Sequence, residues 1–428
     1  MIDVCLIYLP KPFLRQPDAQ APLGLMYIAA ALESAGKTVE LKHYAAYSDE
    51  QAINDLPSAH LYGITATALE IPHSNRFGAL IKLKYPDAKI VVGGPGVYAK
   101  EFIDKKIIDS ICYGDGEEII LNILNDAKCN AMSPLYNGGA IENLDTLNLP
   151  ARHLLKDRQG GDIFAYGKHY ADGDSTIIVS SRGCPMQCAF CSAPALTYSN
   201  KLRFRSPKEI AKEIRYVKEK YGITQFRFSD DFFTANRQRV FDLCDAIGPE
   251  NIFWRISCRV KPLDEDMLRA MWNAGCRELS FGVESFDDRV LTGLNKNATS
   301  MDNVRALDLA SAYDYSVRIL LMIRTPFQEF DTIDKNIFWL NRVPFNIVAC
   351  TTFVPLPGSA IWNNPDVYNI EILDKDLDKY NFYFFGPDGR RPIDKIFRIK
   401  NRDIDEFHKE SEFFRDWLEN DLKKINKG

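Results

Sequence analysis

A short loop with three cysteines constrains this chain more than any other feature of its sequence. Cys184, Cys188 and Cys191 have the spacing C-x3-C-x2-C and follow the apolar, β-branched run at residues 176–179. That run predicts a buried strand, and the glycine and proline beside Cys184 predict a loop at its end. Cysteine thiolates are the usual protein ligands of iron–sulfur clusters. Because three thiolates serve three irons, the loop predicts a four-iron cluster with one iron open to a small molecule.

Two other uses of these cysteines fit the sequence less well. Structural zinc takes four ligands, commonly in C-x2-C pairs, and no second pair matches this loop. A disulfide framework pairs its cysteines, whereas the loop holds an odd number of them. The chain has ten cysteines in 428 residues, with three clustered, which suits a reducing compartment. We therefore expect a cytoplasmic protein.

The spacing, with Phe190 directly before the last cysteine, resembles the cluster loop of the radical S-adenosylmethionine (SAM) superfamily. The resemblance implies a [4Fe-4S] cluster on Cys184, Cys188 and Cys191, with SAM at the open iron and Phe190 beside the cofactors. One electron then cleaves SAM to a 5′-deoxyadenosyl radical, which abstracts hydrogen from a substrate. The resemblance also implies a small-molecule or peptide substrate and an electron donor of the flavodoxin or ferredoxin type.

Apolar runs and helical stretches alternate six times between residues 171 and 362. After the cluster strand, the expected strands are residues 225–229, 253–259, 279–285, 317–323 and 347–353. Six successive βα units predict a partial (β/α)6 barrel, which is also the fold that the resemblance implies. Residues 206–209, Ser-Pro-Lys-Glu, predict a capping box at the start of the first barrel helix.

Polar residues stand at the ends of these runs, where a barrel of this kind has its active site. They are Asp230, Asp231, Arg259, Glu284, Ser285 and Arg324. The resemblance implies that Glu284, with Ser285 beside it, binds the ribose hydroxyls of SAM, since an ionised carboxylate only accepts hydrogen bonds. It also implies that Asp230 and Asp231 lie near the SAM amino group, although one of them is alternatively a cap of the next helix. Cys258 is our candidate hydrogen donor to a product radical.

Two arginines have competing interpretations. Arg259 fits a bidentate contact with the SAM carboxylate or a substrate anion, and the alternative is an ion pair with Asp230 or Asp231. Arg324 stands where relatives carry glycine, in the sequence Arg-Thr-Pro-Phe-Gln-Glu. Our hypothesis is that Arg324 recognises a substrate carboxylate or phosphate, and the alternative is a salt bridge to Glu329.

The first 148 residues show the same alternation of strands and helices. Their apolar runs lie at residues 4–9, 38–41, 61–65 and 90–95. This order predicts a doubly wound, Rossmann-like parallel sheet. The segment resembles the cobalamin (B12)-binding domain ahead of many radical SAM domains, at residues 22–25, 63–65, 93–95 and 114–117. The resemblance implies that Thr65, Gly93 and Gly94 contact cobalamin, because small residues let the backbone approach a flat macrocycle. No D-x-H-x-x-G motif is present, so a sheet that kept the fold and lost the cofactor remains the alternative.

The predicted organisation is therefore a B12-binding-like domain (1–148), a linker (149–170), a partial barrel (171–362) and a mostly helical C-terminal extension (363–428). A net charge of −5 gives no electrostatic case for nucleic acid, and no apolar run is long enough for a membrane span. With cobalamin, the expected reaction is C-methylation at an unactivated carbon. The alternatives are a cobalamin-independent radical dehydration, rearrangement, cyclisation or oxidation, and a non-catalytic iron–sulfur scaffold.

Overall fold

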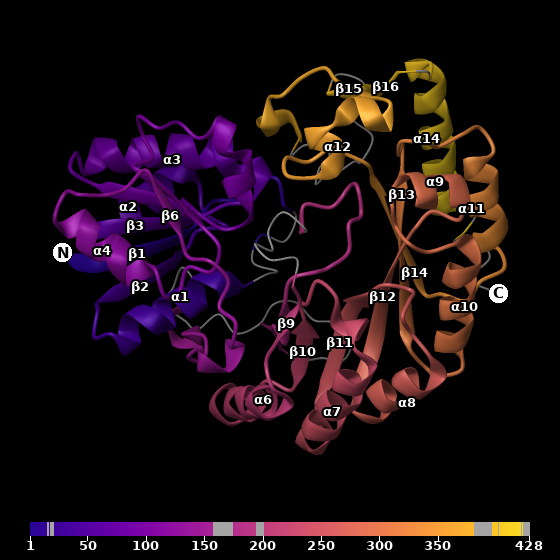
Figure 1. The fold of residues 1–428 in the computed structure, drawn as a ribbon, viewed down its shortest axis with the longest axis horizontal. Coiled ribbons are helices and arrows are strands. Elements are labelled where there is room, and N and C mark those ends of the chain that lie inside the picture. The colour runs from indigo at the N-terminus through magenta and orange to yellow at the C-terminus, as the bar shows by residue number, and fades with distance from the viewer. Residues whose placement is uncertain are drawn as a thin grey trace.

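The structure is a computed structural model that describes residues 1–14, 17, 21–156, 174–193, 201–380, 396–400, 402–420 and 422. Figure 1 shows two α/β bodies side by side, the N-terminal one in indigo to purple and the second in magenta to orange. Each body is built on a six-stranded parallel sheet. The predicted fold class, a doubly wound sheet followed by a partial barrel, is confirmed.

The N-terminal sheet has the strand order β2-β1-β3-β4-β5-β6. Its strands are β1 (Ile2–Tyr8), β2 (Val39–His43), β3 (Ala59–Thr65), β4 (Lys89–Gly93), β5 (Ser110–Tyr113) and β6 (Leu135–Asn137). Its helices are α1 (Leu23–Ser34), α2 (Asp49–Asp55), α3 (Ile71–Lys84) and α4 (Ile120–Lys128). The direction of winding reverses between β1 and β3, and ligands of such sheets bind beyond the carboxyl ends of the strands at this point.

Both faces of this sheet are buried, which explains the apolar runs in its central strands β1, β3 and β4. On β1, Val4 and Leu6 pack in the core beneath α1 and α4, whereas Cys5 and Ile7 pack in the core on the α3 side. Helix α1 begins after Pro22, and Gly36 follows its end with a φ of +69°. These are the residue types expected at the two ends of a helix.

The second sheet has the strand order β14-β13-β12-β11-β10-β7, and all neighbouring pairs are parallel. Its strands are β7 (Ser175–Ile178), β10 (Gln225–Phe228), β11 (Phe253–Cys258), β12 (Cys276–Glu284), β13 (Ser316–Ile323) and β14 (Ile347–Thr352). The helices on its outer side are α6 (Pro207–Tyr221), α7 (Arg237–Ile247), α8 (Glu265–Asn273), α10 (Ser300–Ser311) and α11 (Thr332–Leu340) (Figure 1). The carboxyl ends of the strands gather at one mouth.

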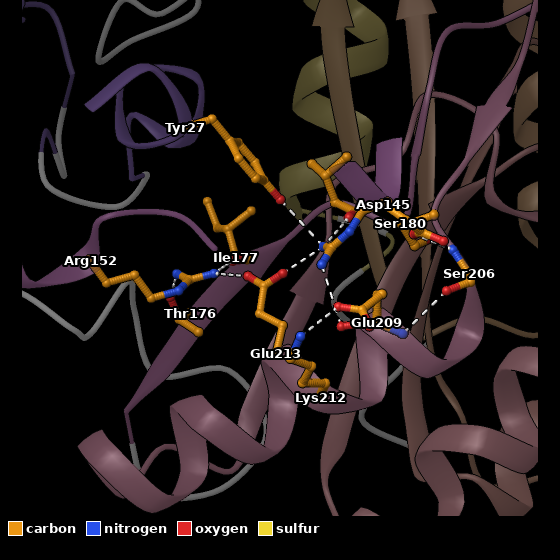
Figure 2. Close-up of polar contacts among 12 residues, drawn as sticks. Tyr27, Asp145, Arg152, Thr176, Ile177, Ser180, Ser206, Glu209, Lys212 and Glu213 are labelled. Carbon is orange, nitrogen blue, oxygen red and sulfur yellow. Dashed lines mark hydrogen bonds and ion pairs between the residues drawn. The ribbon is translucent and has the colours of Figure 1, made fainter. Parts of the chain in front are cut away.

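The first barrel helix corrects one local prediction. Ser206 Oγ accepts a hydrogen bond from the Glu209 amide at 3.3 Å, as a cap should. The reciprocal half of the predicted capping box is replaced, because the Ser206 amide donates to Asp145 Oδ1 at 2.8 Å (Figure 2). The Glu209 carboxylate instead pairs with Lys212 at 3.0 Å. A residue from the end of the N-terminal domain therefore helps to start a helix of the barrel.

The C-terminal region contacts both bodies. It contains α12 (Ala360–Asn363), the antiparallel pair β15 (Ile370–Ile372) and β16 (Phe397–Ile399), and α14 (Ile404–Asn420). The predicted helical extension thus also holds a small sheet. Trp362 packs against Phe102 of the N-terminal domain, with ring centroids 6.1 Å apart, and Phe414 lies in the barrel core. Among the helices in the described ranges, none has the length and apolar character to cross a bilayer.

Candidate active site between the two sheets

A cavity of about 380 Å³ lies between the carboxyl edge of the N-terminal sheet and the cysteine loop. From the N-terminal domain it is lined by Leu23, Gly24, Thr65, Gly93, Gly94, Gly114 and Gly116, among others. From the barrel it is lined by Val179, Ser181, Arg182, Gly183, Ser229 and Asp231. The cavity brings together Thr65, Gly93, Gly94 and Asp231, which the sequence placed in separate motifs. Neither domain forms the cavity alone.

Glycines make the N-terminal wall of this cavity. Gly94 has a φ of +84°, and a Cβ there would stand 2.5 Å from Thr65 Oγ1. Gly114 has a φ of +77°, and a Cβ there would stand 2.3 Å from the Gly139 carbonyl oxygen. Only glycine adopts these turns without strain, so the backbone packs closely at this edge of the cavity, beside apolar side chains such as Leu23 and Ile120. Such a wall fits a flat macrocycle, and these residues therefore fit cobalamin.

Ion pairs join the two domains at the edge of the cavity. Arg182, two residues before Cys184, donates to Asp115 Oδ1 at 2.9 Å and to Glu117 Oε1 at 2.6 Å. Arg203 donates to the other oxygen of Asp115 at 2.5 Å. Burial alone would raise the pKa of Asp115, but the two guanidinium groups hold it below its usual value. This cluster locks the loop after β5 to the strand that leads into the cysteines. Sequence reasoning missed its pairing because the partners are far apart along the chain.

The three cysteines lie in one loop, with Cys184 and Cys188 buried and Cys191 partly exposed. The loop is anchored where the Ala189 amide donates to the Leu294 carbonyl at 2.8 Å. Burial raises the pKa of the Cys191 thiol to about 11, so this sulfur is protonated until a metal binds. Within the described ranges, no group of three histidine, cysteine or acidic side chains is close enough to hold a single metal ion. A four-iron cluster places each thiolate on a different iron, so it needs more widely separated sulfurs than one ion does. Three cysteines on one short loop are a donor set that fits an iron–sulfur cluster.

The two predicted aspartates have different surroundings. Asp230 accepts hydrogen bonds from the Ser180 amide at 2.8 Å, from Ser180 Oγ, and from Ser181 Oγ at 2.7 Å. It holds the strand end before the cysteine loop, and Asn236 rather than an aspartate caps α7. Asp231 lines the cavity, and burial together with the charge of Asp230 raises its pKa. Only Asp231 of this pair faces the cavity.

Arg259 and Glu284 meet through Lys296. Lys296 Nζ donates to Glu284 Oε1 at 2.7 Å and lies 5.8 Å from the centre of the Phe190 ring. Arg259 Nη1 donates to Cys188 Sγ at 3.2 Å, and Nη2 donates to the Lys296 carbonyl. The alternative ion pair between Arg259 and the aspartates is not formed. Sequence reasoning missed Lys296, which joins the cysteine loop to the acid predicted to bind SAM.

The remaining predicted residues lie outside the lining of the cavity. Arg324 is buried, and its Nη1 hydrogen-bonds to His408 Nδ1 of α14 at 3.1 Å. Its alternative partner Glu329 lies 3.9 Å from Arg402 instead. Ser285 Oγ accepts from the Asp287 amide at 3.1 Å, within the turn after β12. Cys258 packs in the core between the strands and the outer helices, where burial raises its pKa.

A glycine-walled cavity shared with a three-cysteine loop at a barrel mouth defines a cofactor-dependent α/β enzyme. Residues 178–337 match the family model of the radical SAM superfamily, and residues 18–124 match that of the B12-binding domain. The chain therefore carries a radical SAM domain behind an N-terminal B12-binding domain. The cofactors of this superfamily are a [4Fe-4S] cluster and SAM, as predicted.

Similar proteins share this two-domain arrangement. An uncharacterised methyltransferase of Pyrococcus horikoshii is 26% identical over 395 residues, which cover 89% of this chain and 83% of the relative. Hopanoid C-3 methylase of Methylococcus capsulatus is 26% identical over 370 residues, covering 80% and 68%. Among solved structures, the radical SAM methyltransferase TsrM of Kitasatospora setae, with cobalamin and a [4Fe-4S] cluster bound, has a TM-score of 0.65 at 17% identity, covering 84% of this chain and 77% of TsrM. This last likeness establishes the fold.

Proposed function

We propose that this enzyme is a cobalamin-dependent radical SAM methyltransferase that acts on an unactivated carbon. The observation that carries the proposal is the cavity shared by the glycine wall of the B12-binding domain and the cysteine loop. When bound, the cluster and SAM supply a 5′-deoxyadenosyl radical that abstracts hydrogen, and cobalamin supplies the methyl group. Two relatives are a methyltransferase and a methylase by name, which supports methyl transfer.

The residues divide this work between the two domains. Thr65, Gly93 and Gly94 bind the corrin face through main chain and a short side chain. Cys184, Cys188 and Cys191 of the loop hold the cluster. Asp231 and Glu284 orient SAM from the mouth of the barrel, and burial between the domains excludes water from the reacting carbon. A flavodoxin or ferredoxin supplies the electron, and the enzyme acts in the cytoplasm on a small molecule or peptide.

The experiment is an anaerobic optical spectrum of protein produced with hydroxocobalamin, followed by an assay for 5′-deoxyadenosine with SAM and a reductant. Broad iron–sulfur absorption with sharp corrinoid bands, and formation of 5′-deoxyadenosine, are the expected results. Replacing Cys184, Cys188 and Cys191 together by alanine should abolish both the iron absorption and the product. Cys129→Ala is the matched control, because Cys129 is exposed at the end of α4. A cluster without corrinoid in the purified protein would contradict the proposal.

A second candidate is radical cyclisation, because another relative is named anaerobic magnesium-protoporphyrin IX monomethyl ester cyclase, from Rubrivivax gelatinosus, at 23% identity. The two reactions differ in what becomes of SAM. A methyltransferase of this type consumes a second SAM to restore the methyl group, so it forms S-adenosylhomocysteine beside 5′-deoxyadenosine. A cyclase forms no S-adenosylhomocysteine.

A further inference from the structure

The concave face of the barrel sheet carries charge that the proposed cofactors do not use. Phe226, Trp254, Leu279 and Val317 pack in the core against the outer helices. Successive side chains of a strand point to opposite faces, so the residues between them face the barrel interior. These interior residues are polar or charged on four adjacent strands: Arg227 on β10, Arg255 and Ser257 on β11, Glu278 and Ser280 on β12, and Arg318 on β13.

The strand register arranges them in two rows. In the lower row, Arg227 is level with Arg255, and Arg255 is level with Glu278. In the upper row, one step nearer the mouth, Ser257 is level with Ser280, and Ser280 is level with Arg318. Two residues separate the rows along each strand, which corresponds to a height of about 7 Å. Guanidinium groups and hydroxyls thus surround one part of the interior.

The charges in these rows do not balance. Arg255 Nη1 lies 3.1 Å from Glu278 Oε1, and Arg318 Nε lies 3.7 Å from the same oxygen. Arg227 has no hydrogen bond or ion pair with any residue that the structure describes. Burial, and then repulsion from neighbouring arginines, lowers the pKa of Arg227. Among the described residues, three guanidinium groups therefore lie near one carboxylate, an arrangement that an added anion would relieve.

Solvent reaches the upper row of these residues. Ser257 is exposed although it lies on the concave face, so the upper row borders open volume. Ser229 follows β10 two residues after Arg227, on the same face, and lines the cavity between the domains. Arg227 therefore lies two residues along β10 from a residue that lines the cavity.

We propose that Arg227, Arg255, Arg318, Ser257 and Ser280 form a barrel oxyanion site that binds a phosphate or carboxylate group of the substrate. Arginine presents paired N–H donors that match both groups, and serine hydroxyls add further donors. The proposal rests on the proposed function, which it deepens by naming the substrate class: an anionic small molecule whose oxyanion enters the barrel while its reacting carbon stays at the mouth.

The test uses the anaerobically reconstituted enzyme with inorganic phosphate as the probe. The thermal midpoint is measured against phosphate concentration, with potassium chloride holding the ionic strength constant. The expected result is a saturable rise, and Arg227→Gln should weaken the apparent phosphate affinity by about tenfold, the effect of losing a hydrogen bond to a charged group. Arg269→Gln is the control, because Arg269 is an exposed arginine of α8 paired with Asp266. Repeating the titration with succinate distinguishes a phosphate site from a carboxylate site. A stronger response to succinate than to phosphate assigns the site to a carboxylate.

Arg318→Gln is the second variant, so that the test does not depend on one protein. A phosphate response that is absent in the wild type, or unchanged in both variants, would overturn the proposal. The proposed function fails by a different measurement, because loss of corrinoid absorption or of S-adenosylhomocysteine leaves this anion titration unaffected. Conversely, a missing phosphate response leaves the corrinoid spectrum unchanged.

Discussion

Two groups of arginines, one buried at the domain boundary and one half-buried in the barrel, differ in how many of their guanidinium groups contact a carboxylate. At the domain boundary, Arg152 and Arg205 place their guanidinium groups on the two oxygens of Glu213, at 2.8 and 2.5 Å (Figure 2). Arg205 also donates to Tyr27 OH of α1 at 3.3 Å. In the barrel interior, by contrast, Arg227 has no such partner in the described residues. At the domain boundary every guanidinium group contacts a carboxylate and helps to hold the two domains together, whereas the barrel group, in which Arg227 contacts none among the described residues, has the properties of a ligand site.

The largest expected effect is at Glu213, which is 1% exposed. Glu213→Gln leaves two buried guanidinium groups without a carboxylate, so it should lower the free energy of unfolding by about 3–5 kcal/mol. Denaturant unfolding followed by fluorescence measures the change. Glu209→Gln, on the same helix in a more exposed pair with Lys212, is the control and should cost less than about 1 kcal/mol. Equal losses of unfolding free energy in the two variants would show that the carboxylate of Glu213 is no more important than an exposed one.

The second prediction concerns Asp115, which accepts hydrogen bonds from both Arg182 and Arg203. Its lowered pKa means that the folded protein binds a proton less readily than the unfolded chain. The stabilisation is therefore fully present above the unfolded value of about 3.9 and is lost as the pH falls below it. Asp115→Asn should cost about 2 kcal/mol at pH 7 and remove this part of the acid dependence. Unfolding measured from pH 7 to pH 3 checks this, and an unchanged pH profile would contradict it.

The third prediction concerns Arg259, whose guanidinium group donates a hydrogen bond to a cysteine sulfur instead of a carboxylate. With a cluster held by Cys188, as proposed, the hydrogen bond from Arg259 to Cys188 Sγ would stabilise the more negative, reduced state. Losing a bond worth about 1.4 kcal/mol in Arg259→Gln should therefore lower the midpoint potential by about 60 mV. A redox titration followed by electron paramagnetic resonance measures it, with Arg269→Gln as control. An unchanged potential with weaker SAM binding would instead favour the SAM-carboxylate role expected from the sequence.

The smallest expected change in stability is at Arg227. Without an anion, Arg227→Gln removes an unmatched charge, so it should leave the stability unchanged or raise it by up to about 1 kcal/mol. The same unfolding assay used for Glu213 measures it in chloride buffer. A loss comparable to that of Glu213→Gln would mean that Arg227 is a structural cation.

The sequence allowed the strands and the cluster loop to be predicted because their signals are local. Apolar runs, a terminal glycine and the cysteine spacing are each contained within a few residues. The clusters could not be predicted, because Arg152 and Glu213, or Arg259 and Cys188, are separated by 61 and 71 positions. Asp230 and Asp231 show the limit most clearly. Both follow the same strand, but the direction of each side chain depends on the register of β10 with its neighbours.

The C-terminal region completes the apolar core of the first domain, although it is synthesised last. Ile370, Phe397 and Phe407 belong to the same apolar core as Cys5 and Ile7 of the first strand. Arg76 of α3 also pairs with Asp378 at 2.5 Å. During translation the first domain leaves the ribosome early, but part of its apolar surface stays uncovered until these late residues have been made. While the C-terminal region is still being synthesised, the first domain therefore exposes apolar surface through which it can aggregate.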